Sequence, residues 1–269
     1  MLNFAHFFRK FLYMYTYDTT VISPFCDSDY YLTGKYCFYY IQEVAGRREM
    51  SVGTGIPALL KENKSWVLLS THLEFYKKVY WQTPIHLVTE GYKPVGMAAP
   101  RRVMCVDDEG DEVFRGDSIF AVVGIVDGKH RLIKPNEVTD RSTYDDDPAI
   151  PFAPRFRKFN IDDYGTSYVV KHKVLHTDCD INGHMNNLKY TSWMISCLPS
   201  NAFEGENDVQ EMDVVFSHEL YLNDEVDIKV CFDEKNSTPE SKIYYVAIGE
   251  ASYGKIKIGK VRKGKMRTE

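Results

Sequence analysis

Hydrophobic and polar positions along the chain follow two periods, first a helical one and then an alternating one, and this order occurs twice. Residues 33 to 48 place Tyr36, Tyr40 and Val44 on one face of a predicted helix. Residues 184 to 198 form a second predicted helix that is apolar over most of its circumference and ends before Pro199. A helix of the second kind is expected to be buried on most sides.

Apolar and polar residues alternate after each predicted helix, which is typical of strands. The alternation is clearest at Val226, Ile228, Val230, Phe232, Ile256 and Ile258. The acidic turn at residues 107 to 111 lies between two apolar runs and predicts a hairpin.

The two halves of the chain share a pattern. Residues 75 to 85 and 216 to 226 have Phe, an aliphatic residue, Tyr and a closing aliphatic residue at the same offsets, which aligns Lys78 with Glu219. An Asp-x-Asp pair precedes each helix, and this pattern aligns Asp29 with Asp180. We therefore predict an internal duplication in an α+β fold, with one long buried helix wrapped by an antiparallel sheet, made twice.

Composition places a linker between the halves. Residues 139 to 158 contain three Pro and an acidic triplet and show no apolar period. We predict an N-terminal domain over residues 1–138, a linker over 139–163 and a C-terminal domain over 164–269. The apolar start is interrupted by Arg9 and Lys10, so we expect an N-terminal arm or a mis-called start rather than a secretory signal.

Charge and cysteine usage exclude several classes of protein. The net charge of -5 argues against a nucleic-acid partner. No segment approaches the roughly 18 apolar residues that a membrane span needs. The six cysteines include no CxxC pair, which predicts free thiols and a cytoplasmic location.

The densest polar cluster, residues 176 to 190, lies at the entrance to the second helix. It holds more Asp, Asn and His than helix capping needs, which favours a functional site. A calcium loop is disfavoured because Lys189 stands where a bidentate carboxylate is required. A transition-metal site from His176, Asp178, Asp180 and His184 lacks a recognised spacing, and Cys179 and Cys197 are expected to be structural thiols.

The cluster contains the pattern Asp180-x-Asn182-x-His184-x-Asn186-Asn187-x-Lys189-Tyr190-x-x-Trp193. This pattern resembles the signature of the acyl-acyl carrier protein thioesterases of plant plastids and bacteria. The resemblance to that family covers nearly the whole chain. The resemblance implies a double hotdog fold and hydrolysis of a fatty acyl thioester on acyl carrier protein. It also implies a catalytic set of Asp180, Asn182, His184 and Glu219, with no metal or organic cofactor. Leu220 stands where plant members often have Cys, which argues against a cysteine mechanism.

Several points stay open at this stage. The alternatives are an acyl-coenzyme A thioesterase and a non-catalytic acyl-binding module, and a homodimer is one option for the assembly. Attack on the thioester can come from water or from Asp180. Candidate docking clusters for the acidic carrier are the basic residues between 255 and 267, the Arg101–Arg102 pair and residues 155 to 158. By the duplication, Asp29 and Lys78 are expected to matter little for turnover, and Lys78 only modestly for stability.

Overall fold

The computed structural model describes residues 14–126, 128–140, 144, 151–153, 156–165 and 167–266. The first half contains β1 (Met14–Thr20), η1 (Ser23–Phe25), α2 (Gly34–Ser51), α3 (Ile56–Leu60), β2 (Lys64–Phe75), β3 (Lys77–Lys78), β4 (Pro84–Gly91), β5 (Ala99–Asp107), β6 (Glu112–Val126), β7 (Lys129–Ile133) and η2 (Pro135–Glu137). The second half contains η4 (Ile161–Tyr164), β8 (Tyr168–Lys173), η5 (His176–Asp178), α4 (Asn187–Ser196), η6 (Ser200–Phe203), β9 (Asn207–Phe216), β10 (Glu225–Phe232), β11 (Ser241–Ile248), β12 (Ser252–Lys260) and β13 (Arg262–Lys263).

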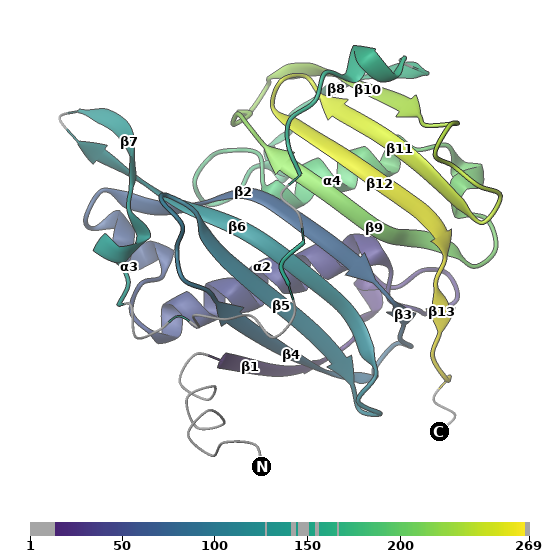
Figure 1. The fold of residues 1–269 in the computed structure, drawn as a ribbon, viewed down its shortest axis with the longest axis horizontal. Coiled ribbons are helices and arrows are strands. Elements are labelled where there is room, and N and C mark those ends of the chain that lie inside the picture. The colour runs from purple at the N-terminus through teal and green to yellow at the C-terminus, as the bar shows by residue number, and fades with distance from the viewer. Residues whose placement is uncertain are drawn as a thin grey trace.

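One 11-stranded sheet runs through both halves (Figure 1). Its order is β1-β4-β5-β6-β2 and then β9-β12-β11-β10-β8, with β7 paired to β6. Read outward from the β2–β9 junction, each half contributes five strands in the same relative sequence order. The predicted duplication is therefore visible in the strand order itself.

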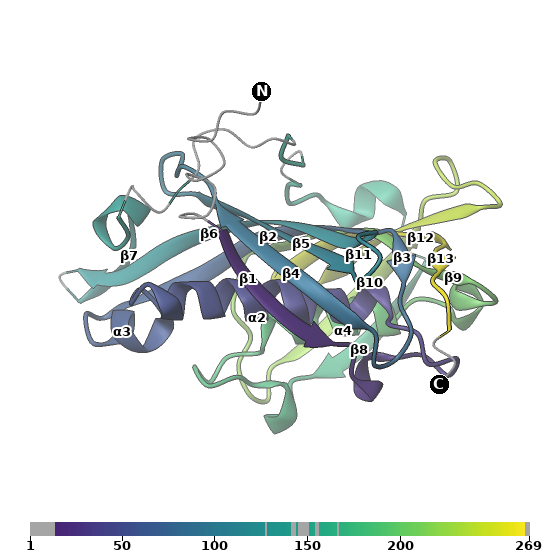
Figure 2. The ribbon, with the colours of Figure 1, turned by 90° about the horizontal axis from the view of Figure 1, so that it is seen from below.

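The two long helices lie on the same face of this sheet (Figure 2). Residues of α2, of α4 and of the sheet face beneath them belong to one hydrophobic cluster, which includes Phe38, Ile41 and Met194. Gly34 lets the start of α2 approach β9, because an added Cβ would lie 2.9 Å from the Cβ of Val209. The predicted architecture of a buried helix and an antiparallel sheet, made twice, is confirmed.

The helices and the hairpin largely follow the sequence prediction. Both observed helices overlap their predicted ranges, although α4 begins three residues later than expected because residues 184 to 186 are extended. The acidic turn at residues 107 to 111 does connect the antiparallel strands β5 and β6.

Parts of the predicted linker cross the outer face of the sheet. The backbone N–H of Ala153 donates to Asp117 at 2.8 Å, and Phe152 packs against the guanidinium of Arg102. Phe159 packs against Tyr245 and Tyr253. The rest of the linker and the predicted N-terminal arm lie largely outside the described residues.

The end of the chain returns to the first half. The short strand β13 pairs with β3 in parallel, and the N–H of Gly264 donates to the carbonyl of Lys78 at 2.7 Å. In the described part of the chain, no helix is both long enough and apolar enough to cross a membrane.

Candidate active site

Asp180 and Asn182 share a tight turn between η5 and α4. The Asn182 N–H donates to Asp180 Oδ1 at 2.8 Å, and the Asn182 side-chain amide lies 3.5 Å from Oδ2. Gly183 completes the turn with a φ of 79°, a backbone conformation that glycine adopts without steric cost. Local hydrogen bonds therefore fix the carboxylate of Asp180.

His184 follows this turn and faces Glu219 from the loop after β9. His184 Nδ1 lies 3.3 Å from Glu219 Oε1, and their side chains are 32% and 52% exposed. The Tyr221 hydroxyl donates to Glu219 Oε2 at 3.0 Å, and its ring contacts His184 edge-on. The hydrogen bond to Glu219 raises the pKa of Tyr221, so the phenol stays protonated and continues to donate. The result is a row of three interacting groups open to solvent.

Tyr190 of α4 holds the loop that carries Glu219. Its hydroxyl accepts from the Leu220 N–H at 3.0 Å and donates to the His218 carbonyl at 3.4 Å. Burial raises the pKa of Tyr190 to about 12. β9 ends at Phe216, so His218 and Glu219 lie in the loop beyond it.

Sequence reasoning assigned no role to Tyr190 or Tyr221. Tyr190 stands in the motif that carries the family resemblance, so its position there was a signal. Tyr221 lies two residues after Glu219, and only the loop geometry turns its hydroxyl back onto that carboxylate. Both tyrosines therefore position Glu219 rather than extend the predicted catalytic set.

A pocket of about 210 Å³ opens beside the Asp180 turn. Asp180, Asn182 and Asn187 line it from the second half, and Gln42 and Glu49 line it from α2. Asn187 is the first residue of α4, whose N-terminus carries partial positive charge. Of the four predicted catalytic residues, Asp180 and Asn182 lie in the pocket wall. His184 and Glu219 belong, with Tyr221, to the row of interacting groups that follows the turn.

The structure also bears on the calcium loop and the reactive cysteines that were considered for this segment. Asp178 is buried, accepts from the Leu175 N–H at 2.9 Å and pairs with Lys189 at 3.3 Å. A lysine thus faces the carboxylate that a calcium loop would use first. The thiol of Cys179 donates to the Leu175 carbonyl at 3.7 Å, and burial raises the pKa of Cys197, which disfavours a thiolate there.

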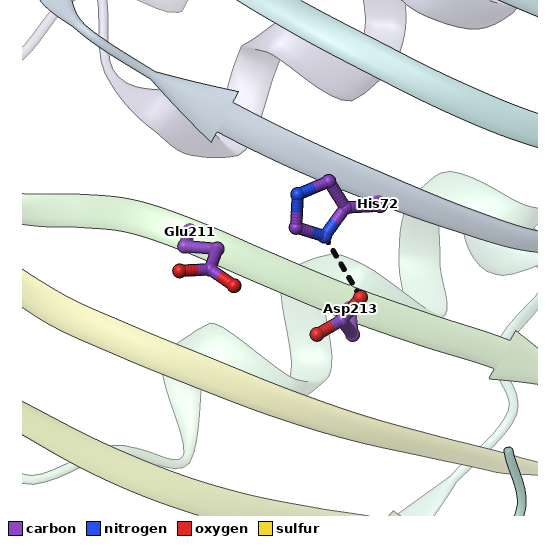
Figure 3. Close-up of side chains that lie close together, drawn as sticks. All are labelled: His72, Glu211 and Asp213. Carbon is purple, nitrogen blue, oxygen red and sulfur yellow. Dashed lines mark hydrogen bonds and ion pairs between the residues drawn. The ribbon is translucent and has the colours of Figure 1, made fainter. Parts of the chain in front are cut away.

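Two groups of possible metal ligands occur in the described part of the chain, and neither contains a predicted catalytic residue. The group Asp107, Glu109 and Asp111 is bound by Lys77, whose ammonium contacts all three carboxylates. The other group lies on the outer face of the β2–β9 junction (Figure 3). There His72 Nδ1 lies 2.8 Å from Asp213 Oδ1, with Glu211 beside them, and this pairing accounts for the cluster.

The first half contains a loop with the same backbone hydrogen bonds as the Asp180 turn. The Asp27 N–H donates to the Tyr31 carbonyl at 2.8 Å, as the Asp180 N–H does to His184. Asp27 Oδ1 accepts from the Asp29 N–H at 3.0 Å, as Asp180 Oδ1 does from Asn182. The equivalent pairs are Cys26 and Cys179, Asp27 and Asp180, Asp29 and Asn182, Tyr31 and His184.

The predicted alignment of Asp29 with Asp180 is therefore wrong by two residues. It rested on an Asp-x-Asp pattern whose members have different roles in the two copies. Asp27 forms the turn, whereas Asp178 is used for the Leu175 N–H and Lys189. The alignment of Lys78 with Glu219 is confirmed, because the carbonyls of Val79 and Leu220 accept equivalent bonds from Leu32 and Met185.

Lys78 is buried between two carboxylates. Its ammonium lies 2.9 Å from Asp27 Oδ2 and 2.9 Å from Asp208 Oδ2. Burial lowers the pKa of Lys78, but the charges of Asp208 and Asp27 outweigh burial and hold it above the ordinary value. The expectation that Lys78 matters only modestly for stability does not agree with this burial, because removing it would strand a buried carboxylate.

Several residues of the predicted basic docking clusters already have partners within the protein. Arg101 and Arg102 are buried, in ion pairs with Glu49 and Asp117. In the C-terminal segment, Arg262, Lys263 and Lys265 each lie 3.0 Å from an acidic group of the first half, namely Asp111, Asp29 and Glu109. Of the third cluster, Arg155 lies outside the described residues and Lys158 stacks on the Tyr253 ring.

Residues 162–258 match the family model of the acyl-ACP thioesterase C-terminal domain. A chloroplastic acyl-acyl-carrier-protein hydrolase of Cuphea viscosissima is 26% identical over 153 residues. That match covers 55% of this chain and only 36% of the relative's length.

Solved structures resemble the chain over almost its full length. An acyl-ACP thioesterase from Bacteroides thetaiotaomicron is 18% identical with a TM-score of 0.75, and covers 93% of this chain and 99% of its own. A 12:0-ACP thioesterase from Umbellularia californica is 17% identical with a TM-score of 0.79, over 92% and 94%. The chain therefore has the double hotdog fold of these structures, and its C-terminal half matches the acyl-ACP thioesterase C-terminal domain, which confirms the predicted resemblance to that family.

Proposed function

We propose that this protein hydrolyses the thioester of an acyl group on acyl carrier protein and releases the free fatty acid. The observation that carries the proposal is the fixed carboxylate of Asp180 in the wall of a pocket that adjoins the His184–Glu219 row. The family match of the C-terminal half and the carrier-protein hydrolase among its relatives support the same reaction.

The carboxylate of Asp180 acts on the acyl carbon, directly or through a water molecule. Over the whole reaction, the oxygen of water joins the acyl carbon, the carbon–sulfur bond breaks and the departing sulfur takes a proton. Asn182 orients Asp180 through its backbone N–H. His184, held by Glu219, is placed to exchange protons with the reacting groups.

The N-terminus of α4 supplies stabilisation for the negative charge that develops on the acyl oxygen. Asn186 caps the helix by accepting from the Leu188 N–H at 2.8 Å, and Asn187 faces the pocket. Backbone donors that are already oriented cost no reorganisation when the oxyanion forms. Catalysis is thus assigned to the C-terminal domain of residues 164–269, with the N-terminal domain shaping the pocket.

The test is incubation with a series of acyl carrier proteins and, side by side, with the same acyl groups on coenzyme A. We expect faster release of fatty acid from the carrier protein, and loss of release in Asp180→Asn. Faster release from coenzyme A would replace the carrier by coenzyme A as substrate. Tight carrier binding without release from any substrate would show a binding module instead.

The location of the protein and its assembly are separate predictions. All six cysteines are free thiols in the structure, in keeping with the predicted cytoplasmic location. Fractionation of cells that express the tagged protein tests the location, and light scattering tests whether the chain forms a homodimer.

A further inference from the structure

The pocket beside Asp180 has one apolar wall and one polar wall. Ile56, Leu68 and Phe120 form part of the apolar wall, as a hydrocarbon chain requires. Gln42, Glu49 and Arg101 face the same space. Its volume of about 210 Å³ is small beside the roughly 300–1,000 Å³ of drug-sized ligand sites.

The polar wall is organised around a half-enclosed ion pair. The side chains of Arg101 and Glu49 are 11% and 14% exposed. Thr54 donates to Glu49 Oε2 at 2.6 Å, and Arg101 Nη1 donates to Thr89 Oγ1 at 3.2 Å. These bonds hold both charged groups in place, so the polar character of the wall is built into the fold.

Arg48 adds a second guanidinium next to this pair. It is 5% exposed, and its Nη1 has no hydrogen-bond partner among the described residues. Burial and the neighbouring Arg101 lower the pKa of Arg48. Arg48 is not among the residues that line the pocket, so the side-chain donors of this wall that face a ligand belong to Gln42 and Arg101.

Gln42 lines the pocket, and its side-chain amide contains a donor that the described residues leave unused. Its Nε2 is buried and has no hydrogen-bond partner there. A buried donor without a partner costs about 1–3 kcal/mol. A plain hydrocarbon chain would keep this cost, whereas an oxygen on the chain would remove it.

We propose that the pocket recognises an acyl group with a hydrogen-bond-accepting oxygen near the thioester, as in 3-hydroxyacyl and 3-oxoacyl chains. Gln42 and Arg101 are the specificity-determining residues. The oxygen lies near the thioester because Asp180 and Gln42 line the same small space. The inference rests on the proposed thioesterase function for the identity of the reacting group.

Binding of non-hydrolysable amide analogues of acyl-pantetheine tests the inference apart from hydrolysis. Saturated, 3-hydroxy and 3-oxo chains of matched length are compared, with the fluorescence of Trp66 in the pocket wall as the signal. We expect the oxygenated analogues to bind about tenfold more tightly, as one recovered hydrogen bond allows. Trp66→Phe identifies the signal of this tryptophan.

Gln42→Met should bring the three affinities together while it keeps the volume of the side chain. Gln210→Met is the matched control, because the Gln210 amide donates to the Lys260 carbonyl and Gln210 does not line the pocket. It should leave the tenfold preference unchanged. A difference between hydroxy and oxo analogues shows which oxygen the site takes.

The results separate this inference from the proposed function. Equal or tighter binding of the saturated analogue to the wild-type protein overturns the polar subsite, even if saturated carriers are hydrolysed. A preference for oxygenated analogues that survives Gln42→Met overturns the role of Gln42. Failure to hydrolyse any acyl carrier protein overturns the proposed function, and the binding preference still decides the subsite.

Discussion

The Asp180 turn is held by hydrogen bonds between residues close in the chain, and His184 is partly exposed, so side chains here can be replaced without loss of the fold. Asp180→Asn and His184→Ala should each lower turnover by on the order of 10²–10⁴, the range for a positioned acid–base group. Turnover at saturating acyl carrier protein is the measurement. Unchanged thermal unfolding shows that the fold is intact, and near-full turnover in His184→Ala would remove it from the mechanism.

Tyr221 acts through Glu219 rather than on the substrate. Tyr221→Phe removes the donor to Glu219 Oε2 and keeps the ring against His184. We expect turnover to fall by roughly tenfold, as the loss of one hydrogen bond to a charged group allows. The pH profile of turnover should shift as well, which a purely structural role would not produce. In a Glu219→Ala background, Tyr221→Phe should cause no further loss of turnover.

The equivalent loop of the first half should contribute stability and no chemistry. Asp27, and not Asp29, is the counterpart of Asp180, and it neutralises Lys78. Asp27→Ala and Asp29→Ala should therefore leave turnover nearly intact. If Asp27→Ala loses as much turnover as Asp180→Asn and remains folded, catalysis involves both halves.

Lys78→Met should destabilise the protein by about 3–5 kcal/mol, because Asp208 is left buried without a cation. Chemical unfolding of the variant measures this. Lys263→Met is the matched control, since Lys263 pairs with Asp29 near the surface and such pairs contribute at most about 1 kcal/mol. Similar losses in the two variants would show that Lys78 is not paired as described.

Among the elements, β2 and β9 form the junction of the two halves, and the pair of His72 and Asp213 crosses it (Figure 3). Burial lowers the pKa of His72, but the hydrogen bond and charge of Asp213, with Glu211 and Glu74, raise it above the ordinary 6.5. The unfolded chain therefore holds this proton less tightly than the folded one. The stabilisation is complete below the ordinary pKa and is lost as pH rises through the raised value.

His72→Gln should accordingly lose more unfolding free energy at about pH 6 than at about pH 9. His86→Gln is the control, because His86 pairs with Asp18 and Asp108 at an exposed edge, where added salt should cancel its effect. Equal losses for His72→Gln at both pH values would contradict the pair across the junction.

The sequence predicts the helices and the duplication, but not all of the contacts between elements. Periodicity located both helices, and the repeated Phe and Tyr offsets aligned Lys78 with Glu219. The loop alignment failed because identical Asp-x-Asp letters hide different hydrogen bonds. The polar wall was out of reach, since Glu49 and Arg101 meet only where β5 passes the end of α2.

The charge distribution of the whole molecule bears on how an acidic carrier would dock. Arg262, Lys263 and Lys265 are in ion pairs, and we expect Lys171 and Lys173 to contribute as well, the latter with its Nζ 4.0 Å from Glu225 Oε1. Both are exposed on β8, the edge strand that leads into the catalytic loop. Replacing both by Gln should raise KM for acyl carrier protein with little change in kcat.

Added salt should raise the wild-type KM and reduce the difference from the double variant. Lys265→Gln is the control, since Lys265 lies outside β8 and pairs with Glu109 of the first half. A KM that is flat with ionic strength would argue against electrostatic steering of the carrier by any cluster.

The continuous sheet across β2 and β9 joins two repeats of one chain, so a substitution in one repeat need not occur in the other. In a symmetric dimer of single repeats, each substitution appears on both sides of the interface. Here Tyr31 could replace the histidine and Lys78 the glutamate in one copy, while His184 and Glu219 stayed in the other. Covalent fusion thus allows the pocket and the reacting groups to vary independently, so substrate choice can drift while the chemistry is kept.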